Sequence, residues 1–241
     1  MNLALVLSVV AACATVAGGV FVIRHLRQRL VWLKAFLAFG AGFLLAAGLL
    51  AMVPESFEAL GREAAVFILA GYLLTHLFEH TMVPHLHFGE ETHGESEALG
   101  DRSFVATVVG LVVHSFFDGV AIGSGFAMSP KLGWLLFFAI ALHKLPDGFT
   151  LASVALASGQ TPRTATLGVL ALAVATIAGT LLVSVVADQA AAALALAAGV
   201  AIYVAATDLM PEVNRERGKR WSLLSFVGVA AFYLTELLLG R

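Results

Sequence analysis

Two short segments of the sequence place a histidine and an aspartate four residues apart. They read HSFFDG at 114–119 and HKLPDG at 143–148. On an α-helix this spacing stacks the two side chains on one face, about one turn apart. Each helix would therefore present one imidazole nitrogen and one carboxylate oxygen in the same direction. Two such helices supply four candidate metal ligands, which are His114, Asp118, His143 and Asp147.

The ligand types narrow the choice of metal. Imidazole with carboxylate suits Zn²⁺, Fe²⁺ and Mn²⁺ better than the harder Ca²⁺ or Mg²⁺. Cys13 is the only cysteine, so the sequence provides no cysteine-rich structural zinc site. We expect Zn²⁺ first, then Fe²⁺, Mn²⁺, Cd²⁺ or Co²⁺. The alternative is that each histidine only makes hydrogen bonds between helices and each aspartate only caps or pairs locally, but two pairs with the same spacing favour a metal site.

The composition indicates that these segments lie in a membrane. Hydrophobic residues make up 60% of the chain and charged residues 12%, with a mean hydropathy of +0.93, whereas soluble domains carry about 25% charged residues. A net charge of -2 without a basic stripe gives no indication of nucleic-acid binding. Apolar runs of about 20 residues recur along the chain. They predict an all-α membrane protein with eight transmembrane helices in one domain, at 3–23, 33–54, 64–82, 104–128, 133–158, 164–187, 190–210 and 221–240.

The depth of the four candidate ligands strengthens the metal interpretation. They fall near the middle of the expected fourth and fifth spans, and consecutive helices with a short connection are expected to be neighbours. A charged side chain at mid-membrane depth costs roughly 2.5–3.5 kcal/mol on insertion scales. Several of them together persist where they face water, the interior of the bundle or an ion. A bound cation would offset that cost.

Positive charge predicts the orientation. Both termini lie on one side if the spans are eight, and placing them outside the cytoplasm leaves only Arg62, Lys131 and Arg241 on that side. The lysines and arginines that then face the cytoplasm are Arg24, Arg27, Arg29, Lys34, Arg102, Arg163, Arg215, Arg217, Lys219 and Arg220. This asymmetry follows the positive-inside rule. We therefore expect both termini to be extracytoplasmic, and the membrane to be the inner (plasma) membrane of a bacterium.

Two span ends echo one another. The second expected span ends in MVPE at 52–55 and the seventh in LMPE at 209–212, on opposite sides of the membrane. Matched sequences at opposite faces are typical of inverted-topology repeats in transporters. We therefore expect an inverted-repeat helix bundle, although a four-residue match is weak support alone. Met52 and Glu55, with Asp208 and Glu212, are candidates for lining the path of the ion, the alternative being packing and helix-end charges.

At 114–119 and 143–147 the sequence resembles the ZIP (Zrt/Irt-like protein) family of divalent-metal transporters, whose fourth and fifth spans carry H-[NS]-x-x-[DE]-G and H-x-x-P-[DE] turns. The resemblance extends to eight spans and to a histidine-rich cytosolic loop between the third and fourth. It implies that His114, Asp118, His143 and Asp147 are transport-site ligands and that Ser115 can touch a second ion. It also implies import into the cytosol, a homodimer, and an elevator-like movement of one helix bundle against another.

Lys144 departs from the pattern. Several members of the family have a carboxylate there that helps to hold a second metal, and Ala175 and Thr176 stand where the sixth span could add a glutamate. We therefore expect one metal per protomer, with the ammonium of Lys144 replacing the second ion. The alternatives for Lys144 are a side chain that extends to the membrane interface, or an ion pair with one of the two aspartates.

The expected cytosolic loop at 83–103 is rich in histidine and acidic residues. A mobile segment of this kind can bind metal weakly, or it can be a solvated linker. The histidines considered for such binding are His80, His85, His87 and His93.

Two functions of other classes remain open. His76, Glu79 and His80 match the H-x-x-E-H signature of inverted zinc proteases. The His/Asp turns could instead relay protons in a carrier of another solute. We expect a transporter rather than an enzyme, because no clear third ligand accompanies the protease signature.

Overall fold

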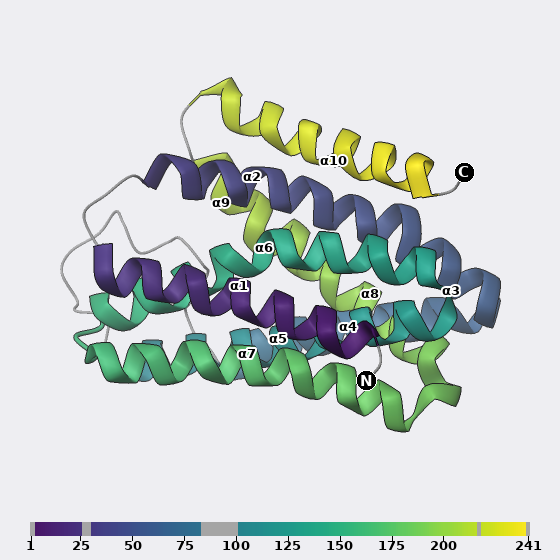
Figure 1. The fold of residues 1–241 in the computed structure, drawn as a ribbon, viewed down its shortest axis with the longest axis horizontal. Coiled ribbons are helices and arrows are strands. Elements are labelled where there is room, and N and C mark those ends of the chain that lie inside the picture. Colours follow the sequence, from purple (N-terminus) through teal and green to yellow (C-terminus); the bar gives the residue numbers. More distant parts are fainter. Residues whose placement is uncertain (1–2, 26–29, 83–100, 216–217, 240–241) are drawn as a thin grey trace.

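The computed structural model describes residues 3–25, 30–82, 101–215 and 218–239, and within these ranges it contains helices and no strands. Figure 1 shows the helices running back and forth along one axis. The first four passes are α1 (Leu3–His25), α2 (Leu30–Ala46) with η1 (Ala47–Met52) and α3 (Val53–Leu60), α4 (Glu63–Met82) and α5 (Asp101–Met128). The other four are α6 (Pro130–Ala157), α7 (Pro162–Val185) with η3 (Ala187–Gln189), α8 (Ala190–Tyr203) with η4 (Val204–Leu209) and α9 (Met210–Arg215), and α10 (Lys219–Leu239).

The helices have the length and composition of membrane spans. Among the described residues, seven helices or continuous helix series are long and apolar enough to cross a bilayer. The third expected span, α4, has 20 residues and carries polar side chains in its last two turns, and it is not one of the seven. Large apolar side chains such as Val66, Leu167 and Leu238 are exposed on the outside of the bundle, as lipid-facing residues are. The prediction of an all-α membrane protein is confirmed.

Short, capped turns fix the order of the central helices. Ser129 precedes α6, and its Oγ accepts a hydrogen bond from the backbone N–H of Leu132 at 3.2 Å. Pro130 follows it at the first helical position, where a missing N–H costs nothing. Thr161 begins α7 in the same way, with Pro162 after it. Because one residue separates α5 from α6, these two helices lie antiparallel and in contact.

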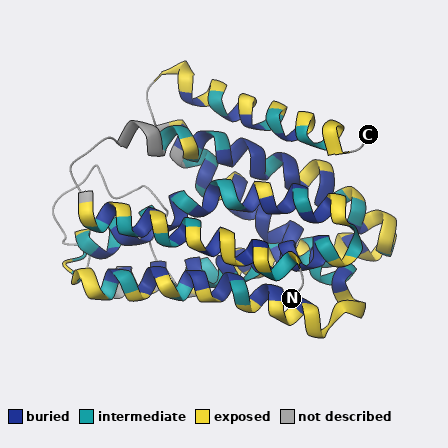
Figure 2. Ribbon diagram, in the orientation of Figure 1, coloured by how far each residue is buried: buried dark blue, intermediate teal, exposed yellow. Residues whose placement is uncertain are grey.

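The helices pack in two sets. α1, α5, α6 and α7 contact one another, while α2 packs against α10, and α3 and α4 pack against α8. α5 touches α8 and α6 touches α2, so these four helices form the contact between the two sets. Figure 2 shows the buried residues concentrated along this contact, and α10 exposed along most of its length. The candidate ligands therefore lie on the innermost helices.

Two glycines let the backbones of the first set approach closely. A Cβ at Gly148 of α6 would overlap the backbone carbonyl of Thr15 in α1, and a Cβ at Gly119 of α5 would overlap that of Thr176 in α7. Each glycine directly follows a candidate aspartate. The sequence requires glycine here because no side chain fits between the helices.

The two matched segments, MVPE at 52–55 and LMPE at 209–212, have the same local structure. Each follows a six-residue π-helical segment, η1 or η4, and in each the helix resumes one residue before a proline, Pro54 or Pro211. π-helical segments are rare and are frequent at functional sites. Figure 1 shows α3 and α9 at opposite ends of the bundle. This arrangement agrees with the expected inverted repeat, which stays a prediction.

A glycine substitution tests the close packing. Gly148→Ala is expected to destabilise the protein by about 1–3 kcal/mol, because the added methyl group must push α6 away from α1. The thermal unfolding midpoint in detergent is the measurement. Gly110→Ala in α5 is the matched control, since a Cβ there has open space around it. Equal midpoints for the two variants would contradict the packing argument.

Candidate functional site

The structure brings the four candidate ligands together. One donor atom from each of His114, Asp118, His143 and Asp147 lies within 4.8 Å of the others, and all four side chains are buried. Oδ2 of Asp118 lies 3.2 Å from Nε2 of His114 and 3.3 Å from Nε2 of His143. Oδ2 of Asp147 lies 3.7 Å from Nε2 of His114. The i, i+4 spacing on two adjacent helices thus produces a compact cluster of two nitrogen and two oxygen donors.

His143 is oriented by its own helix. Its Nδ1 donates a hydrogen bond to the carbonyl oxygen of Ala139, 3.0 Å away, because a carbonyl can only accept. Nε2 is then the ring nitrogen available to a metal ion, and it lies 3.3 Å from Oδ2 of Asp118. This is the form of imidazole that binds a metal ion, with the backbone fixing the tautomer.

His114 lacks this kind of support. Within the described part of the chain, neither of its ring nitrogens makes a hydrogen bond, although the residue is only 5% exposed. A buried polar group normally has a hydrogen-bond partner, and an unsatisfied one is costly. A metal ion would supply the missing partner for Nε2 of His114. The donor set as a whole fits a borderline divalent cation.

Lys144 lies inside the cluster. Its side chain is fully buried, so the alternative that it extends to the membrane interface is wrong. Its Nζ lies 2.6 Å from Oδ2 of Asp118 and 3.2 Å from Oδ2 of Asp147, and it donates to Oγ of Ser115 at 2.8 Å. An ammonium has three N–H donors, and here each has an oxygen acceptor. Both aspartates therefore pair with Lys144, rather than one of them as the sequence alternative allowed.

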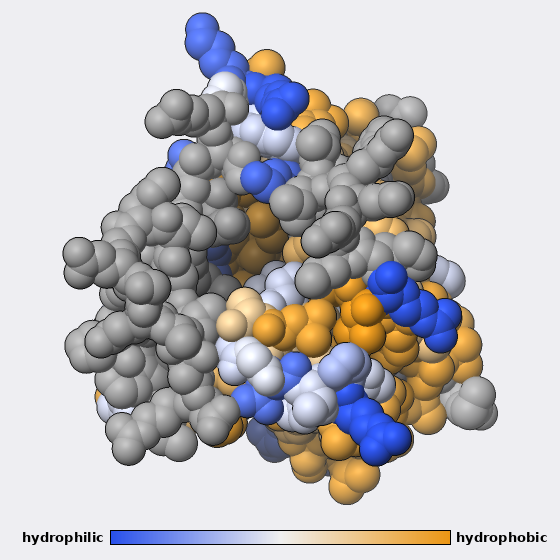
Figure 3. Space-filling model, turned by 90° about the vertical axis from the view of Figure 1, so that its left-hand side faces the viewer, coloured by the Kyte–Doolittle hydropathy of each residue, from blue (hydrophilic) through white to orange (hydrophobic). Residues whose placement is uncertain are grey.

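A cavity of about 300 Å³ reaches the cluster from one end of the bundle. His114 and Asp147 form part of its wall, and Lys34 at the start of α2 and Glu79 near the end of α4 also line it. Figure 3 looks at this end of the molecule and shows a hollow near its centre. The ends of the described chain at α1 and α10 lie at the opposite end of the bundle (Figure 1).

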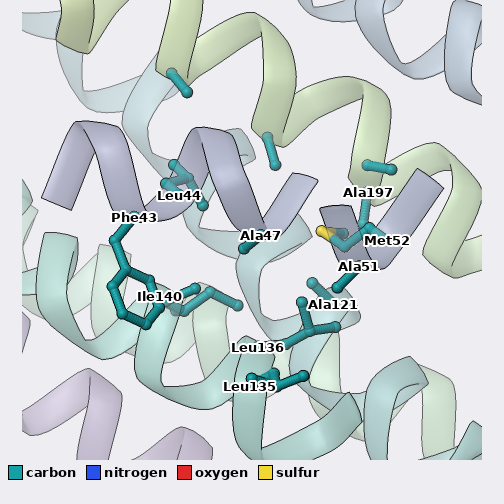
Figure 4. Packing of buried hydrophobic residues seen from close by; sticks show 14 of the residues in the cluster. Phe43, Leu44, Ala47, Ala51, Met52, Ala121, Leu135, Leu136, Ile140 and Ala197 are labelled. Atoms are coloured by element: carbon teal, nitrogen blue, oxygen red, sulfur yellow. The ribbon is translucent and has the colours of Figure 1, made fainter. Parts of the chain in front are cut away.

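The other side of the cluster is closed by apolar side chains. The void there measures about 10 Å³, close to the space for a single water molecule. Asp118 reaches its wall, and Met52 of η1, only 1% exposed, packs beside it. Figure 4 shows the closing side chains, which come from α2, η1, α5, α6 and α8 and are Leu44, Ala47, Met52, Ala121, Leu136, Ile140 and Ala197. Among the described residues, the cluster is thus open toward one end of the bundle and closed by apolar side chains on this side.

The secondary candidates have different positions. Ser115 is in the cluster, Met52 is in the closing group, and Asp208, on η4, lines the open cavity. Glu55 is half-buried on α3, beyond the closing group. Glu212 is on α9, but its side chain is outside the description, as is that of His80 on α4. His85, His87 and His93, with most of the expected loop at 83–103, lie outside the described residues.

One polar group next to the cavity was not predictable from the sequence. The hydroxyl of Tyr203, at the end of α8, donates to Oε2 of Glu79 in α4 at 2.8 Å and lies 3.5 Å from Nδ1 of His76. Glu79 was considered only as part of a protease signature. A carboxylate within an apolar helix was the available signal, but its partner is distant in the sequence.

Taken together, the apolar helices and the enclosed His/Asp cluster define a polytopic membrane protein with a metal-ligand site inside its bundle. The sequence model of the ZIP zinc transporter family matches residues 90–235. The chain belongs to this family, as its resemblance indicated. Because this is a family of transporters, the protease interpretation of His76, Glu79 and His80 is not supported.

Individual relatives match over part of their length. Zinc transporter ZIP4 of Homo sapiens is 36% identical over 138 residues, which are 55% of this chain and 21% of ZIP4. Zinc transporter ZIP9-B of Xenopus laevis is 26% identical over 166 residues, 53% of this chain and 54% of the relative. Zinc transporter ZIP9 of Micropogonias undulatus is 32% identical over 106 residues, 44% of this chain and 33% of the relative. The chain therefore matches between about a fifth and about half of the length of these relatives.

Removing one carboxylate tests the charge network. Asp118→Asn removes the nearer of the two carboxylates that contact the buried ammonium of Lys144, and loss of such a charge-assisted contact costs about 1.5–3 kcal/mol. The midpoint of chemical unfolding should fall accordingly. The double variant Asp118→Asn with Lys144→Met should lower it further, because the buried carboxylate of Asp147 then has no ammonium partner.

Asp188→Asn is the matched control for this experiment, since Asp188 is exposed on η3. Its free energy of unfolding should stay within about 0.5 kcal/mol of that of the unchanged protein. If Asp118→Asn and Asp188→Asn behave alike, Asp118 does not hold Lys144 in the way described.

Proposed function

We propose that this protein carries a divalent transition metal, zinc first, across a membrane into the cytosol. His114, Asp118, His143 and Asp147 would bind the ion, and Fe²⁺, Mn²⁺, Cd²⁺ and Co²⁺ are further candidate substrates. The observation that carries the proposal is the convergence of these four donors within 4.8 Å inside an apolar bundle. Membership of the ZIP zinc transporter family, and relatives described as zinc transporters, support it.

The access to the cluster fits a carrier. A carrier exposes its site to one side at a time, and here one side is open through a cavity of about 300 Å³ while the other holds a void of about 10 Å³. The open end is the end at which α2 begins and α4 ends. By the positive-inside rule this is the cytosolic end, and both termini are extracytoplasmic. The described conformation would then be one that releases metal inward.

Residues outside the cluster would guide the ion. Asp208 and Glu79 line the open cavity and can attract a cation leaving the site. Met52 closes the opposite side, and Glu55 beyond it, together with Glu212 on α9, stays a candidate for the ends of the path. The loop histidines His85, His87 and His93, with His80, are candidates for weak metal binding after release.

The wider setting of the proposal comes from the family resemblance. It comprises a homodimer in the lipid bilayer and movement of one helix bundle against the other. The inner (plasma) membrane of a bacterium is a separate part of the proposal. The two packing sets of helices are compatible with such a movement, because the contact between them runs mainly through α5 with α8 and α6 with α2.

Zinc uptake tests the function directly. In proteoliposomes loaded with a zinc-sensitive dye, the unchanged protein should accumulate Zn²⁺, and His143→Ala should reduce the initial rate by about 100-fold or more, because it removes a ligand and not only its support. His76→Ala is the matched control and should keep most of the uptake, since His76 lies outside the four-ligand cluster.

The competing functions give different results in the same vesicles. A proton current without metal flux would replace metal transport with a proton-coupled carrier of another solute. Uptake in competition with Fe²⁺, Mn²⁺, Cd²⁺ and Co²⁺ orders the substrates.

The stoichiometry is a separate prediction. We expect one metal ion per protomer, because the ammonium of Lys144 already contacts Asp118, Asp147 and Ser115, where a second ion would bind. Isothermal titration with Zn²⁺ measures it. Lys144→Asp, which restores a carboxylate there, should bind two ions. Two ions per protomer in the unchanged protein, with one lost on changing Asp118 alone, would contradict the prediction.

A further inference from the structure

We propose that Lys144 is a tethered counter-cation that allows the empty carrier to return across the membrane. The proposal rests on the proposed carrier function and concerns the half of the cycle in which no metal is bound. A carrier that works repeatedly must reorient twice, once loaded and once empty, and the empty step has to move or enclose a site that has lost its positive ion.

The first step of the argument is the burial of the two carboxylates. Asp118 and Asp147 are 4% and 5% exposed in a bundle whose outer surface faces lipid. An ionised carboxylate without a partner is strongly unfavourable in such surroundings. Within the described residues, the groups that contact them are the imidazoles of His114 and His143 and the ammonium of Lys144. With both imidazoles neutral, Lys144 is the only cation among these contacts.

The second step is the geometry of Lys144. Its Nζ contacts an oxygen of Asp118, of Asp147 and of Ser115 at 2.6, 3.2 and 2.8 Å. Lys144 itself is completely buried. It comes from α6, the helix that also carries His143 and Asp147, so it moves with the ligands in any displacement of that helix. The metal ion is the cargo and leaves the site, whereas Lys144 stays in it.

The third step is a count of formal charge. Two carboxylates and one ammonium give the empty cluster a charge of −1, and adding a divalent metal brings it to +1. Without the ammonium the values would be −2 and 0. Because the cost of burying charge rises steeply with its size, Lys144 makes the loaded state less favourable and the empty state much more favourable. The two reorientation steps thereby face charges of equal size.

The proposal separates two fluxes that are usually measured together. Exchange of metal across the membrane, with metal on both sides, uses only the loaded step. Net uptake into metal-free vesicles also needs the empty return. Lys144→Met should therefore leave exchange of ⁶⁵Zn²⁺ within about threefold of the unchanged protein, while net uptake falls by about tenfold or more, because only the empty site then carries two uncompensated charges.

Three further variants complete the experiment. Lys144→Arg keeps the positive charge and should keep the ratio of net uptake to exchange seen in the unchanged protein. Lys144→Gln, neutral but able to contact the same oxygens, should behave as Lys144→Met does, and it serves the comparison if the Met variant does not fold. Lys131→Met is the matched control, since Lys131 is exposed at the start of α6. Binding of Zn²⁺ measured by titration shows which variants are folded.

The outcomes are distinct. A selective loss of net uptake in the neutral variants, with exchange preserved, supports the proposal. Equal losses of exchange and net uptake, or the same selective loss in Lys144→Arg, overturn it, because Lys144 would then act through shape rather than charge. If the unchanged protein shows neither flux, the proposed carrier function fails, and that result is separate from any result on the variants.

Discussion

The structure depends on keeping two aspartates ionised in an apolar bundle. Asp118 and Asp147 have almost no contact with solvent, and burial of a carboxylate is tolerated only with compensating charge or hydrogen bonds. Lys144 supplies that charge from the same helix as Asp147, and two imidazoles add dipoles that can also bind a metal. The packing of α5 against α6 places these groups within reach of one another.

The surroundings of the cluster differ sharply between its two sides. Toward one end of the bundle the cavity is lined by polar groups, among them Asp208 and Glu79, and Glu79 accepts a hydrogen bond from Tyr203. Toward the other end, Met52 and its apolar neighbours leave a void of only about 10 Å³. An ion in the cluster would exchange its hydration shell for protein ligands from one direction only. The same four donors can therefore serve either membrane face if the closing contacts change sides.

The sequence predicted the parts of the site that depend on local spacing. The pairs His114 with Asp118 and His143 with Asp147 were predictable, because residues four apart on a helix lie on the same face. The eight helical passes followed from runs of apolar residues.

The contact between Glu79 and Tyr203 was not predictable, because it joins α4 to α8 across more than a hundred residues of chain. The apolar closing group was not predictable either, because Met52 is an apolar residue in an apolar run, as lipid-facing residues also are. The alternative that the side chain of Lys144 extends to the membrane interface was wrong. The sequence shows that this side chain is long, but it does not show that two carboxylates lie close to its ammonium.

The backbone contacts at Gly119 and Gly148 also determine how the cluster can move. Where side chains separate two helices, they can change rotamer when the helices shift. Where two backbones are in direct contact, no such adjustment is possible. α5 is therefore coupled to α7, and α6 to α1, close to the aspartates on both ligand helices. A displacement of α5 would carry α7 with it, and a displacement of α6 would carry α1, so each ligand helix can shift only together with its neighbour.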